Sequence, residues 1–130
     1  MEKKTTTSSG TRFLIDLHDC HRGITLDEGF SLEALVRVIQ DAGMTVKNAS
    51  FVPFPDGTVN AHLDLSESHF SMGSYREARY ISGELSVCND QRNNRPRGRK
   101  AAKLIATLFE PTKVEITEKT WKTGPLRKTR

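Results

Sequence analysis

Apolar and polar residues alternate along several short stretches of this chain, and that alternation limits it to folds with half-buried strands. The clearest case is residues 59–65, where every second residue is apolar. Successive side chains of a strand point to opposite faces, so this pattern predicts one buried and one polar face. Weaker signals predict strands over residues 12–18, 44–54, 81–88 and 114–120.

Two other stretches have helical spacing. Apolar residues recur at helical intervals over residues 32–42, between Ser31, which is a favourable N-cap, and Gly43, which is placed to end the helix. A second amphipathic helix is predicted over residues 101–108. The basic stretch before it, residues 92–99, contains Pro and Gly and is predicted to be a loop.

The order of these elements predicts an α+β fold, a two-layer α/β sandwich with an antiparallel or mixed sheet and helices on one face. A chain of 130 residues fits one domain. We expect residues 11–122 to form it, after a disordered polar leader (residues 1–10) and before a basic tail (residues 123–130). The polar second face of several strands would suit a site or a partner subunit as well as solvent.

Composition excludes several classes of protein. No run approaches the roughly 18 apolar residues of a membrane span, and residues 1–10 lack the apolar segment of a signal peptide, so a cytoplasmic protein is expected. The two cysteines have no Cys-x-x-Cys spacing, which favours reduced thiols. Residues 18–21 include four possible metal ligands, but tetrahedral sites usually draw ligands from separated positions, so no metal is expected.

The segment Glu67, Ser68, His69 carries the most specific signal in the sequence. Cys88 lies twenty residues beyond Ser68 (88 − 68 = 20), and a Phe- and Pro-rich turn occupies residues 51–57. In these features the chain resembles the prokaryotic class of S-adenosylmethionine decarboxylase, a small enzyme of polyamine synthesis. The resemblance extends over most of the chain from the first predicted strand to the last.

The resemblance implies that the chain cleaves itself between Glu67 and Ser68 and converts Ser68 to a pyruvoyl group. Such a group forms a Schiff base with a substrate amine and withdraws the electrons that carbon dioxide leaves behind, so no added cofactor is needed. Cys88 is implied as the proton donor of the decarboxylation. The resemblance also implies a homodimer or a dimer of processed protomers.

Nucleoside binding is implied for Phe54, Tyr75 and Glu77. Phe54 corresponds to an adenine-stacking phenylalanine of the family. The family's Trp-Pro-Glu reads Tyr75, Arg76, Glu77 here, so a ring and a carboxylate are kept. Arg76 replaces the proline, which changes both the charge and the freedom of the backbone.

Two positions differ from the family in residues that support self-cleavage. Counted without gaps, a processing serine corresponds to Asn60, and the histidine five residues after the cleavage serine corresponds to Gly73. Asn60 could still hydrogen-bond a carbonyl, whereas Gly73 has no group that exchanges a proton. His69 and His62 are therefore candidate substitutes.

Other functions stay open at this point. The altered residues 75–77 allow a pyruvoyl-dependent arginine or ornithine decarboxylase. The changes at Asn60 and Gly73 allow an uncleaved S-adenosylmethionine-binding protein or a lyase. A nucleic-acid-binding module that uses the arginines of residues 92–100 is least favoured, because no recognised module accompanies them. Without the resemblance, Ser68 and His69 would be read as turn residues and Cys88 as an inert thiol.

Overall fold

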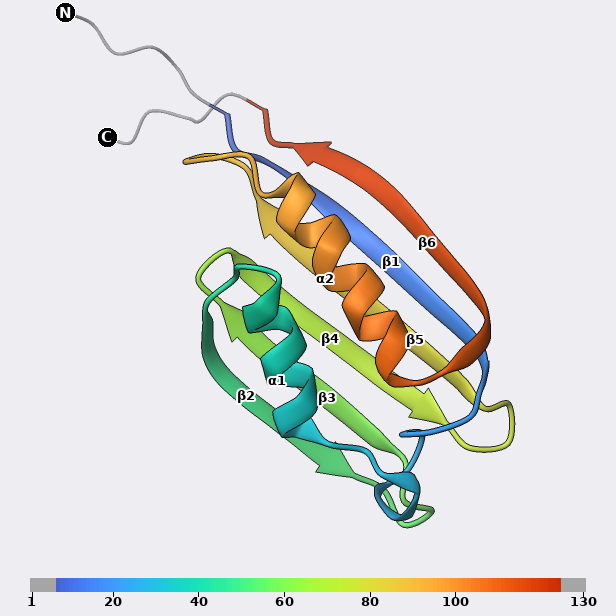
Figure 1. The fold of residues 1–130 in the computed structure, drawn as a ribbon. Helices are drawn as coiled ribbons and strands as arrows, with labels where there is room; N and C mark the ends of the chain where they lie inside the picture. Colours follow the sequence, from blue (N-terminus) through green and yellow to red (C-terminus); the bar gives the residue numbers. More distant parts are fainter. Residues whose placement is uncertain (1–6, 125–130) are drawn as a thin grey trace, which may run out of the picture.

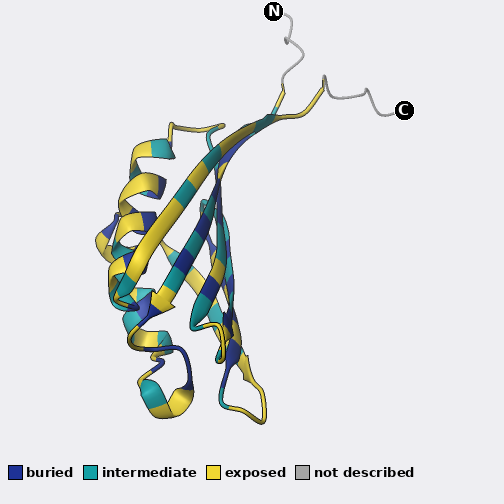
Figure 2. Ribbon diagram, turned by 90° about the vertical axis from the view of Figure 1, so that its right-hand side faces the viewer, coloured by how far each residue is buried: buried dark blue, intermediate teal, exposed yellow. Residues whose placement is uncertain are grey.

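The computed structural model describes residues 7–124, which form one six-stranded sheet with two helices on one face (Figures 1 and 2). The strand order is β2-β3-β4-β5-β1-β6, and every neighbouring pair is antiparallel. The predicted two-layer α+β fold is therefore confirmed, with an antiparallel sheet. The elements, in chain order, are β1 (Ser9–Cys20), the short 3-10 helix η1 (Leu26–Glu28), α1 (Leu32–Asp41), β2 (Val46–Pro53), β3 (Val59–Leu65), β4 (Ser68–Tyr75), β5 (Tyr80–Cys88), α2 (Arg95–Leu108) and β6 (Pro111–Lys122).

The core lies between the helices and the facing side of the sheet. Phe13 and Leu17 of β1 and Leu63 of β3 are fully buried there, as are Leu35 and Ile39 of α1. The side chains between these strand residues point to the other face, as the alternation predicted. Burial of one face of each strand is what holds the helices on one side of the sheet only.

Helix α1 begins and ends close to the predicted positions. The Ser31 side chain accepts a hydrogen bond from the Ala34 backbone N–H at 3.1 Å, which satisfies one free donor of the first turn. Gly43 follows the helix with a φ of 94°, a conformation that glycine adopts without a steric penalty. The N-cap and the terminating glycine are therefore confirmed.

One strand was missed, and one helix was predicted too short. No strand was predicted between residues 65 and 81, yet β4 occupies Ser68–Tyr75 and pairs with both β3 and β5. Its outward residues are small or polar, so its apolar signal is weak. Helix α2 begins at Arg95, within the predicted basic loop, because a proline in the first turn of a helix costs no hydrogen bond and arginine is a good helix former.

The arginines of α2 are partly neutralised within the chain. Arg95 Nε lies 3.0 Å from a Glu118 carboxylate oxygen, and Arg99 Nε lies 2.6 Å from the other. These contacts join α2 to β6 and lower the pKa of Glu118, mainly through the hydrogen bond from Arg99. A stretch that looked free to bind phosphates thus serves in part to attach a helix to the sheet.

The ends of the predicted domain differ slightly from the described structure. β1 begins at Ser9, so the last two residues of the predicted leader belong to the sheet. Residues 1–6 of that leader and residues 125–130 of the predicted basic tail lie outside the described residues. Within residues 7–124, no helix has both the length and the apolar character that crossing a membrane requires.

Candidate functional site

Both helices lie on one side of the sheet, and no layer of the described residues covers the opposite face (Figure 2). The alternation of β3 directs Asn60, His62 and Asp64 to this face, and all three are exposed. A cavity of about 620 Å³ lies over its middle, with His62 and Gly73 among its lining residues. We call this surface the open face.

Glu67, Ser68, His69 and Cys88 lie near one another at one end of the sheet, where β4 begins and β5 ends. Ser68 is the first residue of β4, directly after a tight turn, and lies opposite Val87, the neighbour of Cys88, on β5. The Cys88 backbone N–H donates a hydrogen bond to the Glu67 carbonyl oxygen at 2.8 Å. Glu67 and Cys88 also line a common cavity of about 540 Å³. We call this group of four residues the cleavage-site cluster.

Ser68 has an uncommon backbone conformation. Its φ of 154° lies outside the regions that L-residues usually occupy, and such values cost free energy that the surrounding structure must supply. The preceding turn is held by a Thr45 backbone N–H that donates to the Glu67 carboxylate at 3.2 Å, and by a Ser66 N–H that donates to the Thr45 carbonyl oxygen at 2.9 Å. The Ser68 hydroxyl oxygen lies 3.2 Å from His69 Nδ1.

A second group of predicted residues lies at the opposite end of the sheet. Phe54, Asn60, Tyr75 and Glu77 line one cavity of about 520 Å³, between the turn after β2 and the turn after β4. Phe54 and Tyr75 are 43% and 53% exposed, so both rings are free to contact a ligand. We call this group the aromatic cluster.

Asn60 and Gly73, the two positions that differ from the family, face each other across β3 and β4. A Cβ added to Gly73 would lie 2.9 Å from Asn60 Oδ1, so a side chain there would displace the amide. The structure thus brings the two altered positions together, beside the cavity in the middle of the open face.

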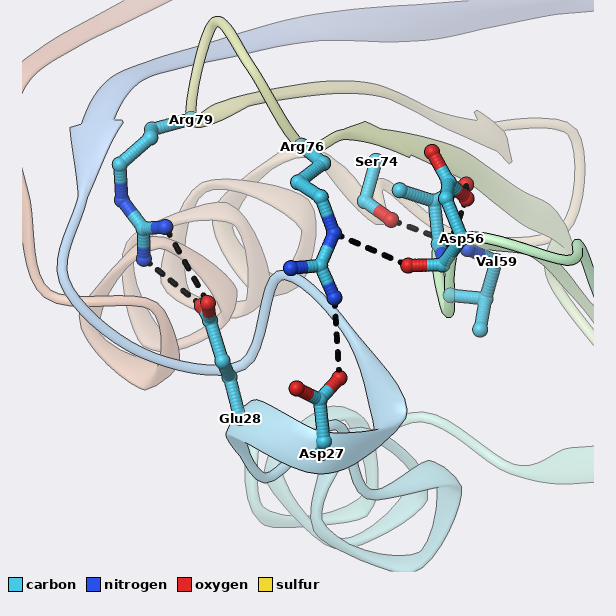
Figure 3. A network of polar contacts seen from close by, with 8 residues as sticks. Asp27, Glu28, Asp56, Val59, Ser74, Arg76 and Arg79 are labelled. Atoms are coloured by element: carbon cyan, nitrogen blue, oxygen red, sulfur yellow. Dashed lines mark hydrogen bonds and ion pairs between the residues drawn. The ribbon is translucent and has the colours of Figure 1, made fainter.

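Two arginines from the turn after β4 contact carboxylates of the 3-10 helix η1 (Figure 3). Arg76 Nε donates to the Asp56 carbonyl oxygen at 2.9 Å, and its Nη2 donates to Asp27 at 3.2 Å. Arg79 donates to both carboxylate oxygens of Glu28, at 2.8 and 3.3 Å. The residue that replaces the family's proline therefore joins the two turns, and it lines the same cavity as Phe54 and Tyr75.

We expect the contribution of the Arg79–Glu28 pair to the stability of the fold to depend on pH. The hydrogen bond from Arg79 lowers the pKa of Glu28 in the folded chain, so the pair stabilises the fold above the ordinary glutamate pKa of about 4.3 and loses that effect as the pH falls. We expect Arg79→Gln to lower the urea midpoint at pH 7, and the difference from the unaltered chain to shrink towards pH 3. Urea unfolding at both pH values measures this.

The matched control for that experiment is Arg22→Gln, which removes an exposed pair with Glu110 at 3.3 Å. Both side chains of that pair are more than half exposed, so the variant should leave the midpoint nearly unchanged. A difference between Arg79→Gln and the unaltered chain that stays constant from pH 7 to pH 3 would contradict the proposed linkage.

The open face also holds an imidazole network that the sequence predicted only in part. His62 Nδ1 lies 2.7 Å from Ser71 Oγ, and His62 Nε2 lies 2.9 Å from Asp64 Oδ1. The His62 ring stacks on the ring of His69, with centroids 5.8 Å apart. The alternation of β3 could have indicated that Asp64 lies on the same face as His62. Ser71 could not have been identified as a partner of His62, because the strand β4 was not predicted.

The cleavage-site and aromatic clusters are too far apart to form one site within a single chain. Ser68 begins β4 and Tyr75 ends it. Seven residue steps of about 3.3 Å separate them by roughly 23 Å along the strand. Each cluster therefore contains only some of the predicted site residues.

Residues 18–21, which include four possible metal ligands, point in different directions. His18 contacts Glu115 at 3.0 Å on β6, whereas Cys20 is fully buried and its pKa is raised to about 11, mainly by burial. Among the described residues, no group of three or more His, Cys, Asp or Glu side chains is arranged to hold a metal ion.

Comparisons with known proteins agree with this description. Residues 11–120 match the family model of S-adenosylmethionine decarboxylase. A curated relative, the S-adenosylmethionine decarboxylase proenzyme of Prochlorococcus marinus (strain MIT 9313), is 30% identical over 83 residues, which are 63% of this chain and 66% of that protein. The crystal structure of the adenosylmethionine decarboxylase from Aquifex aeolicus VF5 has the same fold, with a TM-score of 0.72, 15% identity, and coverage of 96% of this chain and 98% of that one.

Proposed function

Because the chain belongs to the S-adenosylmethionine decarboxylase family, we propose that it decarboxylates S-adenosylmethionine for spermidine synthesis. It does so after cleaving itself between Glu67 and Ser68, which turns Ser68 into a pyruvoyl group. The observation that carries this proposal is the geometry of the cleavage-site cluster. There a strained serine has its hydroxyl beside an imidazole, and the preceding carbonyl accepts a backbone N–H.

Each of these features suits self-cleavage. The reaction begins when the Ser68 hydroxyl attacks the Glu67 carbonyl carbon, which places negative charge on the carbonyl oxygen. The Cys88 N–H already donates to that oxygen at 2.8 Å and would stabilise the charge as it forms. Backbone strain at Ser68 raises the energy of the intact chain and is relieved when the peptide bond breaks.

The residues present also fit the pyruvoyl group. Ser68 supplies its carbons, and Cys88 lines the adjacent cavity with its thiol half-buried. When formed, the group supplies an electron sink for the decarboxylation of an amine substrate. Cys88 is then the proposed donor that returns a proton to the product, because it follows Val87, the residue of β5 that pairs with Ser68.

The aromatic cluster is proposed to bind the nucleoside. Tyr75 and Phe54 offer ring faces to adenine, and Glu77 offers a carboxylate to the ribose hydroxyls. Arg76 also lines this cavity, and its charge is partly neutralised by the Asp27 carboxylate, to which its Nη2 donates. The two ring faces favour S-adenosylmethionine, which has an adenine to stack on them, over the alternative substrates arginine and ornithine, which have no ring.

We also propose that the active protein is a homodimer. The two clusters lie at opposite ends of β4, so a two-fold axis between two open faces would bring the cleavage-site cluster of one protomer to the aromatic cluster of the other. The polar open face, with no layer of the described chain covering it, supplies the surface for this contact (Figure 2). Two equivalent sites would then form per dimer.

The test uses the purified full chain and needs three measurements. Intact mass under denaturing conditions should show two fragments that meet at the Glu67–Ser68 bond, and the second should begin with a pyruvoyl group. Carboxyl-labelled S-adenosylmethionine should release carbon dioxide, whereas labelled arginine and ornithine should not. Sedimentation equilibrium should give the mass of a dimer. Turnover of an amino acid alone would reject the proposed substrate, and a monomer that is fully active would reject the shared site.

A second function is favoured by one observation. Gly73 has no side chain, and the Asn60 amide fills the space opposite it, so the family's histidine and serine are both replaced. A chain that lost self-cleavage would be an uncleaved S-adenosylmethionine-binding protein. It would stay at 14.6 kDa and still bind the nucleoside, which equilibrium dialysis with labelled S-adenosylmethionine measures.

A further inference from the structure

We propose that His69 is the base that starts self-cleavage in this chain, and that Asp64 and His62 are positioning residues for its ring. This inference rests on the proposed function and concerns how the chain reaches its active form. It assigns a proton-transfer group where the position five residues after the cleavage serine holds glycine. The evidence is a row of hydrogen bonds and ring contacts across β3 and β4.

The first link in the row is the contact between His69 and the attacking hydroxyl. His69 Nδ1 lies 3.2 Å from Ser68 Oγ, within the range in which an imidazole accepts a hydroxyl proton. The sequence contains four histidines, and only His62 and His69 belong to β3 and β4. His18 lies on β1, where it contacts Glu115, and His21 follows the end of that strand. His69 is therefore the imidazole placed to act on Ser68.

The step balances without any group from outside the chain except water. His69 Nδ1 takes the hydroxyl proton as Ser68 Oγ bonds to the Glu67 carbonyl carbon. The bond between that carbon and the Ser68 nitrogen then breaks, and the proton passes to the nitrogen, which gives an ester and a free amine. His69, neutral again, takes the Ser68 Cα proton; the electron pair of that bond forms a double bond to Cβ, the Glu67 carboxylate leaves, and a dehydroalanine remains. Water then replaces its nitrogen, which leaves as ammonia, and the pyruvoyl group remains.

The second link is Asp64, which lies directly opposite His69 in the β3–β4 register. Residues paired in this way have Cβ atoms about 5 Å apart, so the carboxylate lies near the imidazole across the strands while one of its oxygens contacts His62 Nε2. When His69 takes the proton it becomes a cation, and the neighbouring carboxylate stabilises that charge. Asp64 thus favours the protonated product of the first step.

The third link is His62, whose ring is held at both nitrogens by Ser71 and Asp64, at 2.7 and 2.9 Å. A ring bonded at both ends has little freedom to rotate. It stacks on His69 with the planes inclined by 25° and therefore limits the orientations available to that ring. His62 fixes the direction in which His69 Nδ1 points, and it touches no reacting atom itself.

The test follows the rate at which freshly made chain is cleaved. The full chain and its variants are produced by cell-free synthesis, and the fragments are measured by intact mass over time. We expect His69→Ala to slow cleavage about 10²- to 10⁴-fold, the usual effect of losing a positioned base. Added imidazole should restore part of the rate, because a small molecule can replace a missing base but cannot repair a folding defect.

Substitutions of the positioning residues Asp64 and His62 should slow cleavage less than His69→Ala does, and the size of the effect should depend on which side chain replaces them. Asp64→Asn should slow cleavage by about 10- to 100-fold, the cost of a misoriented group, and Asp64→Glu should recover most of that loss. His62→Phe keeps a ring over His69 and loses both hydrogen bonds, so it should lie between the unaltered chain and His62→Ala. His21→Ala is the matched control and should cleave at the unaltered rate, because His21 lies outside β3 and β4.

The outcomes separate this inference from the proposed function. Cleavage of the unaltered chain together with equally fast cleavage of His69→Ala would overturn the role of His69 and leave the decarboxylase proposal standing. Slow cleavage of His69→Ala that imidazole does not accelerate would also overturn it. An unaltered chain that never cleaves would reject both proposals, since His69 would then fail to replace the missing helper.

Discussion

Ser68→Ala should remain a single chain of 14.6 kDa after purification, whereas the unaltered protein should be found as two fragments. The expected loss of cleavage is complete, because alanine has no oxygen with which to attack the Glu67 carbonyl. The neighbouring contacts of the cleavage-site cluster do not depend on the hydroxyl: the Cys88 N–H still reaches the Glu67 carbonyl oxygen. Intact mass under denaturing conditions distinguishes the two results.

The matched control for this variant is Ser66→Ala. Ser66 lies two residues earlier in the same turn, and its backbone N–H, not its side chain, anchors the turn to Thr45. That variant should be cleaved like the unaltered chain. Cleavage of Ser68→Ala at the same bond would show that the hydroxyl is not the nucleophile and would end the pyruvoyl proposal.

Phe13→Ala should destabilise the fold by about 3–5 kcal/mol, the usual cost of removing a buried aromatic side chain. Phe13 is fully buried at the centre of β1, beneath α2. Its ring lies so close to Gly98 that a Cβ at that position would overlap it, and this glycine is what lets the helix approach the sheet. Loss of the ring would leave a cavity at the closest contact between the two layers.

Urea unfolding measures that cost, since the midpoint falls in proportion to stability when the slope is unchanged. Leu26→Ala is the matched control, because it also removes a large apolar side chain but at a position 45% exposed. It should change stability by no more than about 1 kcal/mol. Equal losses in the two variants would mean that the core between the layers is not centred on Phe13.

Strong local patterns made most of the fold predictable. The alternation of β3 and the capped helix α1 were both recognised, because each combines a repeat with clear boundaries. β4 was missed for the opposite reason: Gly73 has a low strand propensity and the serines of this strand weaken its apolar signal, so that only pairing with β3 and β5 makes it a strand. The prediction for helix α2 was too short because Pro96 and Gly98 are typical of loops. In the structure, Gly98 is needed for the helix to pack on Phe13.

The sequence predicted candidate site residues, but it did not predict how they are arranged in space. Glu67, Ser68 and Cys88 were identified by their spacing, and the β4–β5 register brings them together. No spacing rule could indicate that the aromatic cluster lies at the far end of β4, because that depends on which strands pair. The roles of Arg76 in joining two turns and of Asp64 in facing His69 likewise follow from contacts between residues distant in the chain or in different strands.

By itself the sequence determined which side chains are apolar, which strand faces are polar, and that a serine and a cysteine with family spacing are present. These are properties of single residues and of short repeats, which are encoded locally. Only the tertiary structure decided that the predicted site residues fall into two clusters at opposite ends of β4, that Asn60 fills the space opposite Gly73, and that two histidines stack beside Ser68. Those relations arise from antiparallel pairing, which joins residues by register across strands rather than by their distance along the chain.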